Sequence, residues 1–577
     1  MSLPLEVVAR RFCLQNAVQH AGKCEPKGLV GRVMGGHPEF RTDPRAVAAA
    51  LDAAGAAVNA MSLDEQVAAL SAEAPELVNV QKKEQRKGLK ELPNVKGRVV
   101  MRFAPNPNGP LSLGHSRGVS ILAEYQRMYD AELILRFDDT DPQVKPPLWD
   151  ERRGWNGYDM IREDFLWLVG RKPSREVTAS DRIGIYQAAA VDLIKVGGAY
   201  VCDCEAEEWR AKKERREACV HRDAAPAASL EGFRAMVAGE TKKGGAVLRV
   251  KTDIAHKDPA LRDWTAFRVI ADDAVHPREK AGQIPRHHAW PLLDFESAIE
   301  DHLQGVTHVI RGKDLMDSTR KQKFLYDHMG WTYPETLYWG RVSVHEFGKF
   351  STSGMRRSIE AGKFMGWDDP RLPCLAALRR RGYDPGAIKA FWVSLGLTEK
   401  DIAVSLSNLD AEDAKVIDPA ASRYFFVPDP QELHVEGLPA RVAKPLVHPS
   451  HPERGSRELR ASRGVYVSMR DLAPRLRLKD LGNIKTEPND TAVYDGEEMD
   501  RSVAIVQWLP VDQAAPFIVL KPEILAEDAP DDAIPALQEI SGMVEPAATA
   551  HVGKVVQFER FGFVRIESAE RGVWLHA

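Results

Sequence analysis

The sequence VVMRFAPNPNGPLSLGHSRG, from Val99 to Gly118, decides the fold of the central part of this chain. Residues 99–103 are apolar except for Arg102 and have the length of a buried strand. Residues 104–110 are rich in Pro, Asn and Gly and predict a loop, which is followed by a helix from about Gly114 to Tyr129. A second apolar strand is expected at residues 133–137, just before the acidic segment Asp138–Pro142.

This order of strand, loop, helix and strand is a βαβ unit. It predicts a parallel sheet that binds ligands at the carboxyl ends of its strands. The loop after the first strand is where backbone N–H groups and a helix N-terminus meet phosphate. Gly114 would let the backbone approach a nucleotide, and His115 could hydrogen-bond a phosphate in the transition state. The alternative for this segment alone is a glycine-containing turn with a surface histidine.

The flanking regions have a different character. Residues 1 to about 80 predict helices, because Val47, Ala50, Leu51 and Ala54 recur at helical spacing after Asp43. The α/β pattern is interrupted by an insertion from Gly197 to about Trp290 and returns at 292–341, and helices follow at 369–397. After about Arg423 the chain consists of short strands with frequent Pro and Gly, which is typical of β-barrels.

Composition limits the function classes. With 577 residues the chain is expected to form about three to five domains. It has no apolar run of about 18 residues and no secretory leader pattern, so we expect a cytoplasmic protein that does not enter a membrane. The net charge of −4 means that any RNA must bind to local basic surfaces. The candidate basic runs, each of which is also typical of a solvated helix face, are Lys82, Lys83, Arg86, Lys87, Lys90 and Arg379–Arg381.

A cysteine cluster predicts a metal site. Cys202-x-Cys204 and Cys219-x-His221 are separated by 14 residues and supply three thiolates and one imidazole, a set that suits tetrahedral zinc. Four protein ligands leave no open position, so the zinc would be structural. The alternative is a hairpin that carries free thiols.

Several segments together carry a family resemblance. Ala104–Pro110, with Gly114 and His115 after it, resembles the first signature of class I aminoacyl-tRNA synthetases, and Asp138–Pro142 resembles the next element of the glutamyl and glutaminyl branch. Further matches are Ser351–Arg357 at the second signature, Gly366–Leu372, Arg379–Gly382, Tyr424–Val427 and His448–Arg457. Over nearly its whole length the chain is similar to archaeal-type glutamyl-tRNA synthetases.

The resemblance implies an α/β fold with a Rossmann catalytic domain, an inserted domain that binds the acceptor end of tRNA, a helical N-terminal region and C-terminal antiparallel β-barrels that read the anticodon. The expected divisions are 1–98 for the helical region and linker, 99–196 and 291–345 for the two catalytic halves, 197–290 for the insertion, 346–415 for the second-signature loop and helical connector, and 416–577 for the barrels.

The resemblance also implies a reaction. Glutamate attacks the α-phosphate of ATP, which is bound with Mg²⁺, and the glutamyl group of the adenylate then passes to the terminal ribose of tRNA-Glu. Charging of tRNA-Gln stays open. The alternatives are a glutaminyl-tRNA synthetase and a synthetase-derived tRNA-binding protein with weakened catalysis. A monomer is expected, and the C-x-C and C-x-H pairs resemble a zinc site of the insertion in some glutamyl enzymes.

Residue roles follow from the same resemblance. The ATP contacts would be Pro105, Gly109, Gly114, His115, Ser351, Thr352, Ser353 and Gly354. The catalytic residues would be His115, Ser112, Lys349 and Arg356. Ser112 replaces the first histidine of the first signature, and Gly354 replaces the lysine of the second. Lys349, Arg356 and Arg357 flank that gap and could supply the missing positive charge.

Substrate selection is expected at an arginine. A glutamate carboxylate requires a cation, whereas a glutamine amide does not. Arg311 is at the position where glutamyl enzymes have arginine, and Arg102 resembles the second arginine that binds the substrate. Asp138 would hold the amino group, and Asp294 is the fourth expected contact. Leu293 replaces a tyrosine that is common in the family.

Overall fold

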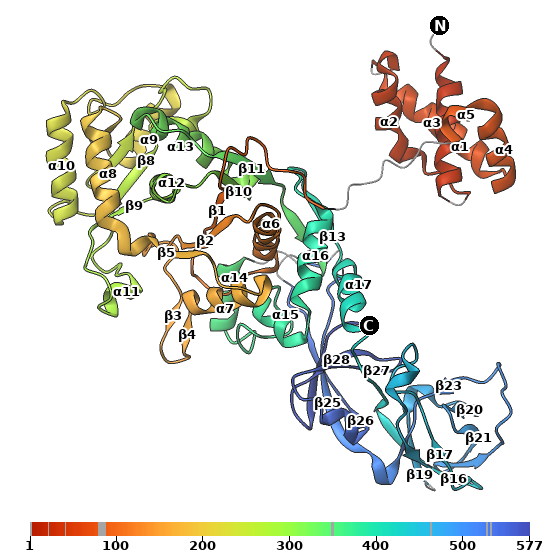
Figure 1. The fold of residues 1–577 in the computed structure, drawn as a ribbon. Helices are drawn as coiled ribbons and strands as arrows, with labels where there is room; N and C mark the ends of the chain where they lie inside the picture. The colour runs from red at the N-terminus through yellow and green to blue at the C-terminus, as the bar shows by residue number, and fades with distance from the viewer. Residues whose placement is uncertain are drawn as a thin grey trace. The chain divides into compact units, whose positions relative to one another are not determined.

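The chain divides into two compact units, Met1–Lys87 and Gly88–Ala577 (Figure 1). The computed structural model describes residues 3–20, 22–40, 42–78, 88–347, 351–461, 464–526, 529–530 and 533–577. No described helix is both long and apolar enough to cross a membrane.

The first unit is helical, as predicted. Its helices are α1 (Leu5–Gln19), α2 (Val30–Gly36), α3 (Pro44–Asn59), α4 (Leu63–Glu73) and α5 (Pro75–Val78). Asp43 caps α3 by accepting hydrogen bonds from the N–H groups of residues 45 and 46, and Ser62 caps α4. The predicted apolar face is confirmed, because Val47 and Leu51 are fully buried in the core of this unit.

The centre of the second unit is a layer of parallel strands. β1 (Val100–Phe103) pairs with β2 (Glu132–Phe137), which pairs with β5 (Arg175–Thr178). A second parallel pair is formed by β10 (His308–Gly312) and β11 (Glu335–Trp339). The N–H of Thr307 donates to the carbonyl of Val100 at 2.9 Å, so β10 lies beside β1. The predicted parallel sheet is therefore confirmed.

Helices cover this layer. α6 (Leu113–Tyr129) connects β1 to β2 and packs on α7 (Gly157–Val169) and α16 (Pro385–Leu395). Trp392 of α16 donates its indole N–H to the hydroxyl of Ser116 at 2.7 Å, which fixes α16 against the start of α6. The other helices of this part are α8 (Ile183–Lys195), α12 (Leu293–Leu303), α13 (Met316–Met329), α14 (Thr352–Glu360), α15 (Leu375–Arg381) and α17 (Leu406–Ile417).

The loop after β1 is held by a close approach of two backbones. The N–H of Leu148 donates to the carbonyl of Pro107 at 2.8 Å. Gly157, the first residue of α7, lies so near that a Cβ atom there would be 2.0 Å from the same carbonyl oxygen. Only glycine fits at this contact, and the contact holds the loop against α7.

The insertion contains an antiparallel sheet in the order β6 (Ala199–Cys202), β7 (Val247–Val250), β8 (Thr265–Val269) and β9 (Ala289–Pro291). Its helices are α9 (Ala206–Arg215), α10 (Pro226–Ala238) and α11 (Pro277–Lys280). The hydrophobic core of the sheet also includes side chains of α8, α12 and α13, such as Tyr186, Phe295 and Leu325. The insertion therefore packs as one body with the catalytic layer.

The C-terminal part has two seven-stranded sheets. The first sheet has the order β14 (Arg423–Tyr424), β27 (Val555–Phe558), β28 (Gly562–Ile566), β29 (Arg571–Trp574), β25 (Ala515–Pro522), β26 (Leu537–Val544) and β15 (Phe426–Pro428). The second has the order β23 (Ile505–Val506), β20 (Arg475–Leu478), β21 (Gly482–Glu487), β22 (Thr491–Tyr494), β16 (Pro430–Glu436), β19 (Gly464–Ser468) and β24 (Leu509–Pro510).

Both sheets are curled almost into barrels. Only Phe425 separates the two edge strands of the first sheet in sequence, and only two residues separate those of the second. Most neighbouring strands are antiparallel, as predicted, but β14 pairs with β27 and β25 pairs with β29 in parallel. Two more parallel pairs occur in the second sheet, β16 with β22 and β20 with β23.

The arginine run of α15 connects the helices to the first C-terminal sheet. Arg380 pairs with Glu567 at 2.7 Å, and Arg381 is buried and donates to the carbonyl of Leu575 at 2.5 Å. Arg379 faces Glu163 at 3.4 Å. The interpretation of this run as an RNA-binding surface is therefore wrong for Arg380 and Arg381, because both take part in internal contacts. Residues 82–87 of the other basic run lie outside the described residues.

We predict that Gly157→Ala lowers the free energy of unfolding by about 1–3 kcal/mol, because the new methyl group collides with a backbone oxygen that no side-chain rotation can move. Gly184→Ala is the matched control, since Gly184 lies in α8 with no atom within 4 Å of the added Cβ. Urea unfolding of the full chain should leave the control at or above the wild-type stability. Equal stability of the two variants would contradict the proposed contact.

Candidate active site and metal centre

A cavity of about 380 Å³ opens at the carboxyl ends of β1, β2, β10 and β11. This is the position where α/β sheets bind ligands. Its wall is formed by side chains from these strand ends, by the start of α6 and by the start of α12. The lining includes Arg102, Pro105, Asn106, Gly114, His115, Asp138, Lys145, Leu293, Ser297, Arg311 and Trp339.

His115 and Ser112 form a reciprocal cap at the start of α6. The N–H of His115 donates to the hydroxyl oxygen of Ser112 at 3.2 Å, and Nδ1 of His115 accepts from the N–H of Ser112 at 3.2 Å. Because Nδ1 accepts, the neutral ring has its proton on Nε2 and can donate it into the cavity. Desolvation lowers the pKa of His115, which favours this neutral form. Ser112 itself does not line the cavity and acts as the helix cap.

The segment that was expected to be the second signature lies against the first. Ser351 caps α14 by accepting from the N–H of Gly354 at 3.0 Å. A Cβ atom on Gly109 would be 2.8 Å from the methyl group of Thr352, so the two segments are in direct contact. Arg356 lies on the following turn and pairs with Glu360 at 2.9 Å. Lys349 lies outside the described residues.

A chain of buried ion pairs lies beneath the cavity. Asp301 of α12 accepts from Arg102 at 3.1 Å and from Arg136 at 2.7 Å, and Arg136 also pairs with Asp138 at 2.7 Å. All four residues are less than a tenth exposed. Burial opposes ionisation of Asp301, but Arg102 and Arg136 hold its pKa below the ordinary value. The two positive and two negative charges therefore balance within the chain.

Glu296, also on α12, lies beside this group. Burial, and then the nearby charge of Asp138, raise the pKa of Glu296 well above its ordinary value. Its nearest cation is Arg136, at 3.9 Å. The raised pKa favours the protonated form of Glu296, in which it adds no charge to the ion chain.

Arg311 is different, because its charge meets only neutral groups. Its guanidinium donates to the hydroxyl of Thr319 at 2.6 Å, to the side-chain carbonyl of Gln322 at 3.0 Å and to the hydroxyl of Tyr333 at 2.8 Å. The residue is 5% exposed and lines the cavity. Within the described ranges no carboxylate pairs with it. A buried cation with neutral partners is suited to the carboxylate of a ligand.

Asp294 is not brought into the cavity with the other predicted residues. Its carboxylate pairs with Lys321 of α13 at 2.7 Å, and it does not line the cavity. The cavity also contains residues that the sequence did not single out, namely Lys145, Ser297 and Trp339. Lys145 follows the acidic segment after β2, and this position was the only signal that could have indicated it.

The cysteine cluster is assembled as predicted. Cys202 ends β6, Cys204 precedes α9, and Cys219 and His221 follow α9. Their ligand atoms all lie within 4.8 Å of one another. The Sγ atoms of Cys202 and Cys219 are 3.8 Å apart, and Sγ of Cys204 is 3.5 Å from Nδ1 of His221.

These distances fit one tetrahedral ion. For Zn–S bonds of about 2.3 Å and Zn–N bonds of about 2.0–2.1 Å, the tetrahedral edges are about 3.8 Å between two sulfurs and about 3.5 Å between sulfur and nitrogen. The other ring nitrogen of His221, Nε2, lies 2.7 Å from Asp203. A carboxylate on the far nitrogen orients the imidazole and increases its strength as a ligand. The donor set therefore fits zinc.

The match to known families extends along most of the chain. Residues 98–419 match the model of the catalytic domain of class I tRNA synthetases (E and Q), and residues 421–500 and 505–567 match two models of the anticodon-binding domain of the same group. The glutamate-tRNA ligase of Methanosarcina mazei is 44% identical over 98% of this chain and 96% of its own length. That of Pyrococcus abyssi is 43% identical over 98% of both chains.

Proposed function

This chain belongs to the class I tRNA synthetases of the glutamyl and glutaminyl group, and we propose how its cavity carries out the glutamate-tRNA ligase reaction. L-glutamate reacts with ATP and Mg²⁺ to give glutamyl-adenylate and pyrophosphate. The terminal ribose hydroxyl of tRNA then attacks the acyl carbon and releases AMP. Such a reaction depends mainly on positioning and on stabilising the negative charge of the phosphate.

We propose that ATP binds across the start of α6. Pro105, Gly109 and Gly114 would let the backbone approach the nucleotide, and the Nε2 proton of His115 would meet the charge that develops on the phosphate. The second segment, Ser351–Gly354, contacts Gly109 through Thr352 and would close the site from the other side. Ser112 would contribute by holding His115 in this tautomer. Arg356 and Lys349 are proposed to add positive charge.

We assign the side-chain carboxylate of glutamate to Arg311. The burial of this arginine among neutral partners is the observation that supports glutamate as the substrate. A buried guanidinium with neutral partners attracts a carboxylate more strongly than an amide, because an amide oxygen can accept a hydrogen bond but only the carboxylate balances the positive charge. Asp138 would hold the amino group at the end of the ion chain, and Arg102 would contribute to the same wall. Asp294 is proposed to have a structural role, because its ion pair with Lys321 connects α12 to α13. A glutaminyl enzyme would not require the charge of Arg311.

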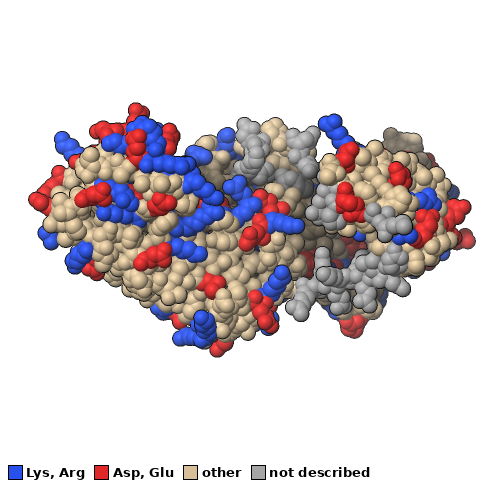
Figure 2. All heavy atoms as spheres, turned by 90° about the horizontal axis from the view of Figure 1, so that it is seen from above, with Lys and Arg blue, Asp and Glu red and all other residues tan. Residues whose placement is uncertain are grey.

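Transfer RNA is proposed to bind to local basic surfaces. On the face drawn in Figure 2, Lys and Arg gather in several groups with Asp and Glu between them. In keeping with the net charge of −4, these basic residues form separate groups and not one continuous surface, and each group could contact the phosphates of the RNA at a different place. Aminoacylation of tRNA-Glu and tRNA-Gln, each with glutamate and with glutamine, tests the proposal and settles whether tRNA-Gln is also charged. We propose that the enzyme acts as a cytoplasmic monomer.

A structural zinc ion is proposed at Cys202, Cys204, Cys219 and His221. Bound zinc would tie the end of β6 to the segment after α9. The insertion packs as one body with the catalytic layer, so this local order would also support the surface that receives the acceptor end of tRNA.

We predict that His115→Asn lowers glutamate activation by about 10²-fold or more, measured by ATP–pyrophosphate exchange with tRNA present. Asparagine at this position can still cap the helix, as Asn408 does for Ser405 at the start of α17. Asparagine lacks the Nε2 proton of histidine, so the variant should lose catalytic activity while it keeps the helix cap and the fold. The melting temperature should stay close to that of the wild type. Wild-type activity in His115→Asn would remove the imidazole from the mechanism.

Arg311→Ala should lower kcat/KM for glutamate by about 10²–10³·⁵, because the buried carboxylate loses its partner at a cost of roughly 3–5 kcal/mol. Activity with glutamine should stay level or rise. Arg320→Ala is the control, since Arg320 is an exposed arginine of the neighbouring helix α13. Equal losses for both amino acids would assign Arg311 to a group that glutamate and glutamine share.

Elemental analysis of the purified protein should find about one zinc per chain, and the double variant Cys202→Ser with Cys204→Ser should lose it. Structural zinc stabilises its fold directly, so hydrogen exchange across residues 199–221 should become faster in this variant. Cys24→Ser, in the first unit, is the control and should keep the metal. A zinc-free wild-type protein with slow exchange in this region would refute the assignment.

A further inference from the structure

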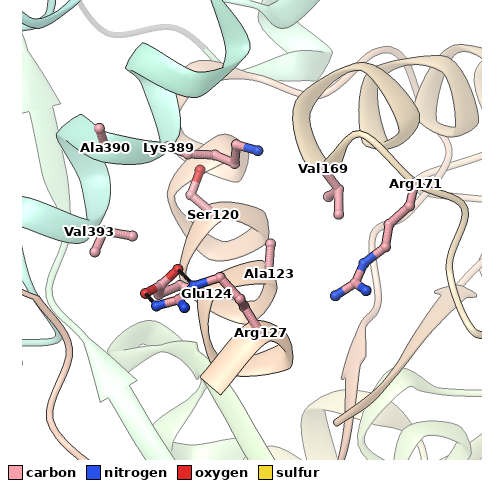
Figure 3. A pocket seen from close by; sticks show the side chains of 9 residues that line it. All are labelled: Ser120, Ala123, Glu124, Arg127, Val169, Arg171, Lys389, Ala390 and Val393. Atoms are coloured by element: carbon pink, nitrogen blue, oxygen red, sulfur yellow. Dashed lines mark hydrogen bonds and ion pairs between the residues drawn. The ribbon is translucent and has the colours of Figure 1, made fainter. Parts of the chain in front are cut away.

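A second cavity, also of about 380 Å³, lies along the C-terminal half of α6, between Ser120 and Arg127 (Figure 3). Its walls come from α6, from α16, and from Val169 at the end of α7 and Arg171 in the segment that follows. It shares no residue with the cavity that contains His115 and Arg311. The lining residues are Ser120, Ala123, Glu124, Arg127, Val169, Arg171, Lys389, Ala390 and Val393.

The charges of this second cavity are not balanced. Glu124 and Arg127 pair with each other through two hydrogen bonds, of 3.0 and 2.7 Å. Arg171 and Lys389 extend toward the same space from opposite sides, as Figure 3 shows. In the described part of the chain Arg171 forms no ion pair with a carboxylate, and Lys389 has only a longer-range interaction with Glu124, which already pairs with Arg127. The cavity therefore carries a surplus of two positive charges.

A buried hydroxyl also faces this space without a partner. Ser120 is 1% exposed, and its Oγ makes no hydrogen bond among the described residues. Figure 3 shows the hydroxyl directed toward Lys389. An unpaired buried hydroxyl costs free energy unless a ligand or water meets it. Ala123, Val169 and Val393 complete the wall with apolar surface.

We propose that this second cavity binds a small organic phosphate and that its occupancy is coupled to the ATP site. A phosphate monoester carries close to two negative charges at neutral pH and has several acceptor oxygens, which match the Arg171 fork, the Lys389 ammonium and the Ser120 hydroxyl. The apolar wall would contact the organic part. A site whose wall includes the apolar side chains of Ala123, Val169 and Val393 favours a small phosphate with an apolar part over the backbone of an RNA, which presents only sugar and phosphate to such a wall.

The coupling follows from the helices that form the cavity. Lys389 and Val393 flank Trp392 on α16, and Trp392 is hydrogen-bonded to Ser116, the residue after His115. A phosphate held between Lys389 and Ser120 would draw α16 and α6 together at this contact. The phosphate must change the affinity for ATP by the same factor by which ATP changes the affinity for the phosphate, because binding free energies are linked reciprocally.

The test measures the binding of phenyl phosphate to the full-length protein by isothermal titration calorimetry. Saturating α,β-methylene-ATP is present throughout and occupies the catalytic site. Phenyl phosphate should bind saturably, more tightly than benzoate, which has one charge, and more tightly than inorganic phosphate, which has no apolar part. Arg171→Gln and Lys389→Gln should each weaken this binding by about tenfold. Lys172→Gln, an exposed neighbour outside the cavity, should leave it unchanged.

Coupling is measured by titrating the nucleotide analogue with and without phenyl phosphate. The two ligands should change each other's Kd by the same factor, and Lys389→Gln should remove the effect. The proposal is overturned if phenyl phosphate does not bind, if the analogue displaces it competitively, if the two cavity variants bind it like the wild type, or if the coupling factor is one. Weaker tRNA binding by these variants, without phosphate binding by the wild type, would assign the surface to RNA instead.

Discussion

The buried ion chain of Arg102, Asp301, Arg136 and Asp138 is the constraint on which the active site depends. It joins β1, β2 and α12 at the edge of the sheet where the ligands bind. Loss of one member would leave a buried charge without a partner, at a cost of roughly 3–5 kcal/mol. These four charges cancel, and the raised pKa of Glu296 favours its neutral form, so the charge of Arg311 is not balanced within the site. In the proposed mode of binding, the selection of glutamate depends on the neutrality of these surroundings as much as on the arginine itself.

The local elements could be predicted from sequence, whereas the contacts between them could not. The strand, loop and helix around Gly114 follow from short-range patterns, and the clustering of the three cysteines with His221 follows from their spacing. The ion chain could not be predicted, because Asp301 is 165 residues from Arg136 and only the packing of α12 brings them together. Asp294 was expected at the substrate, but it lies on the side of α12 that faces Lys321. Ser112 was interpreted as a missing histidine, yet its position as N-cap gives it a role in orienting His115.

Helix α6 connects two sites of different chemistry. Its first turn presents His115 to the catalytic cavity, and its third and fourth turns line the second cavity through Ser120, Glu124 and Arg127. Helix α16 touches both regions, since Trp392 reaches Ser116 while Lys389 reaches the second cavity. Rigid helices that share a hydrogen bond of this kind can transmit a small displacement without unfolding. The same packing that positions the histidine therefore makes it sensitive to events several turns away.

The strand order of the first C-terminal sheet has a consequence for synthesis on the ribosome. Its middle strand, β29, is the last strand among the described residues. It is followed by Leu575, which accepts the hydrogen bond from Arg381, and by His576, which lies 3.1 Å from Asp413. The second sheet needs only residues 430–510 and can form while the ribosome is still translating. The first sheet can be completed only after residues 571–574 have been synthesised. A chain truncated before Arg571 would thus have its catalytic layer and outer sheet complete but would lack the strand at the centre of the sheet between them.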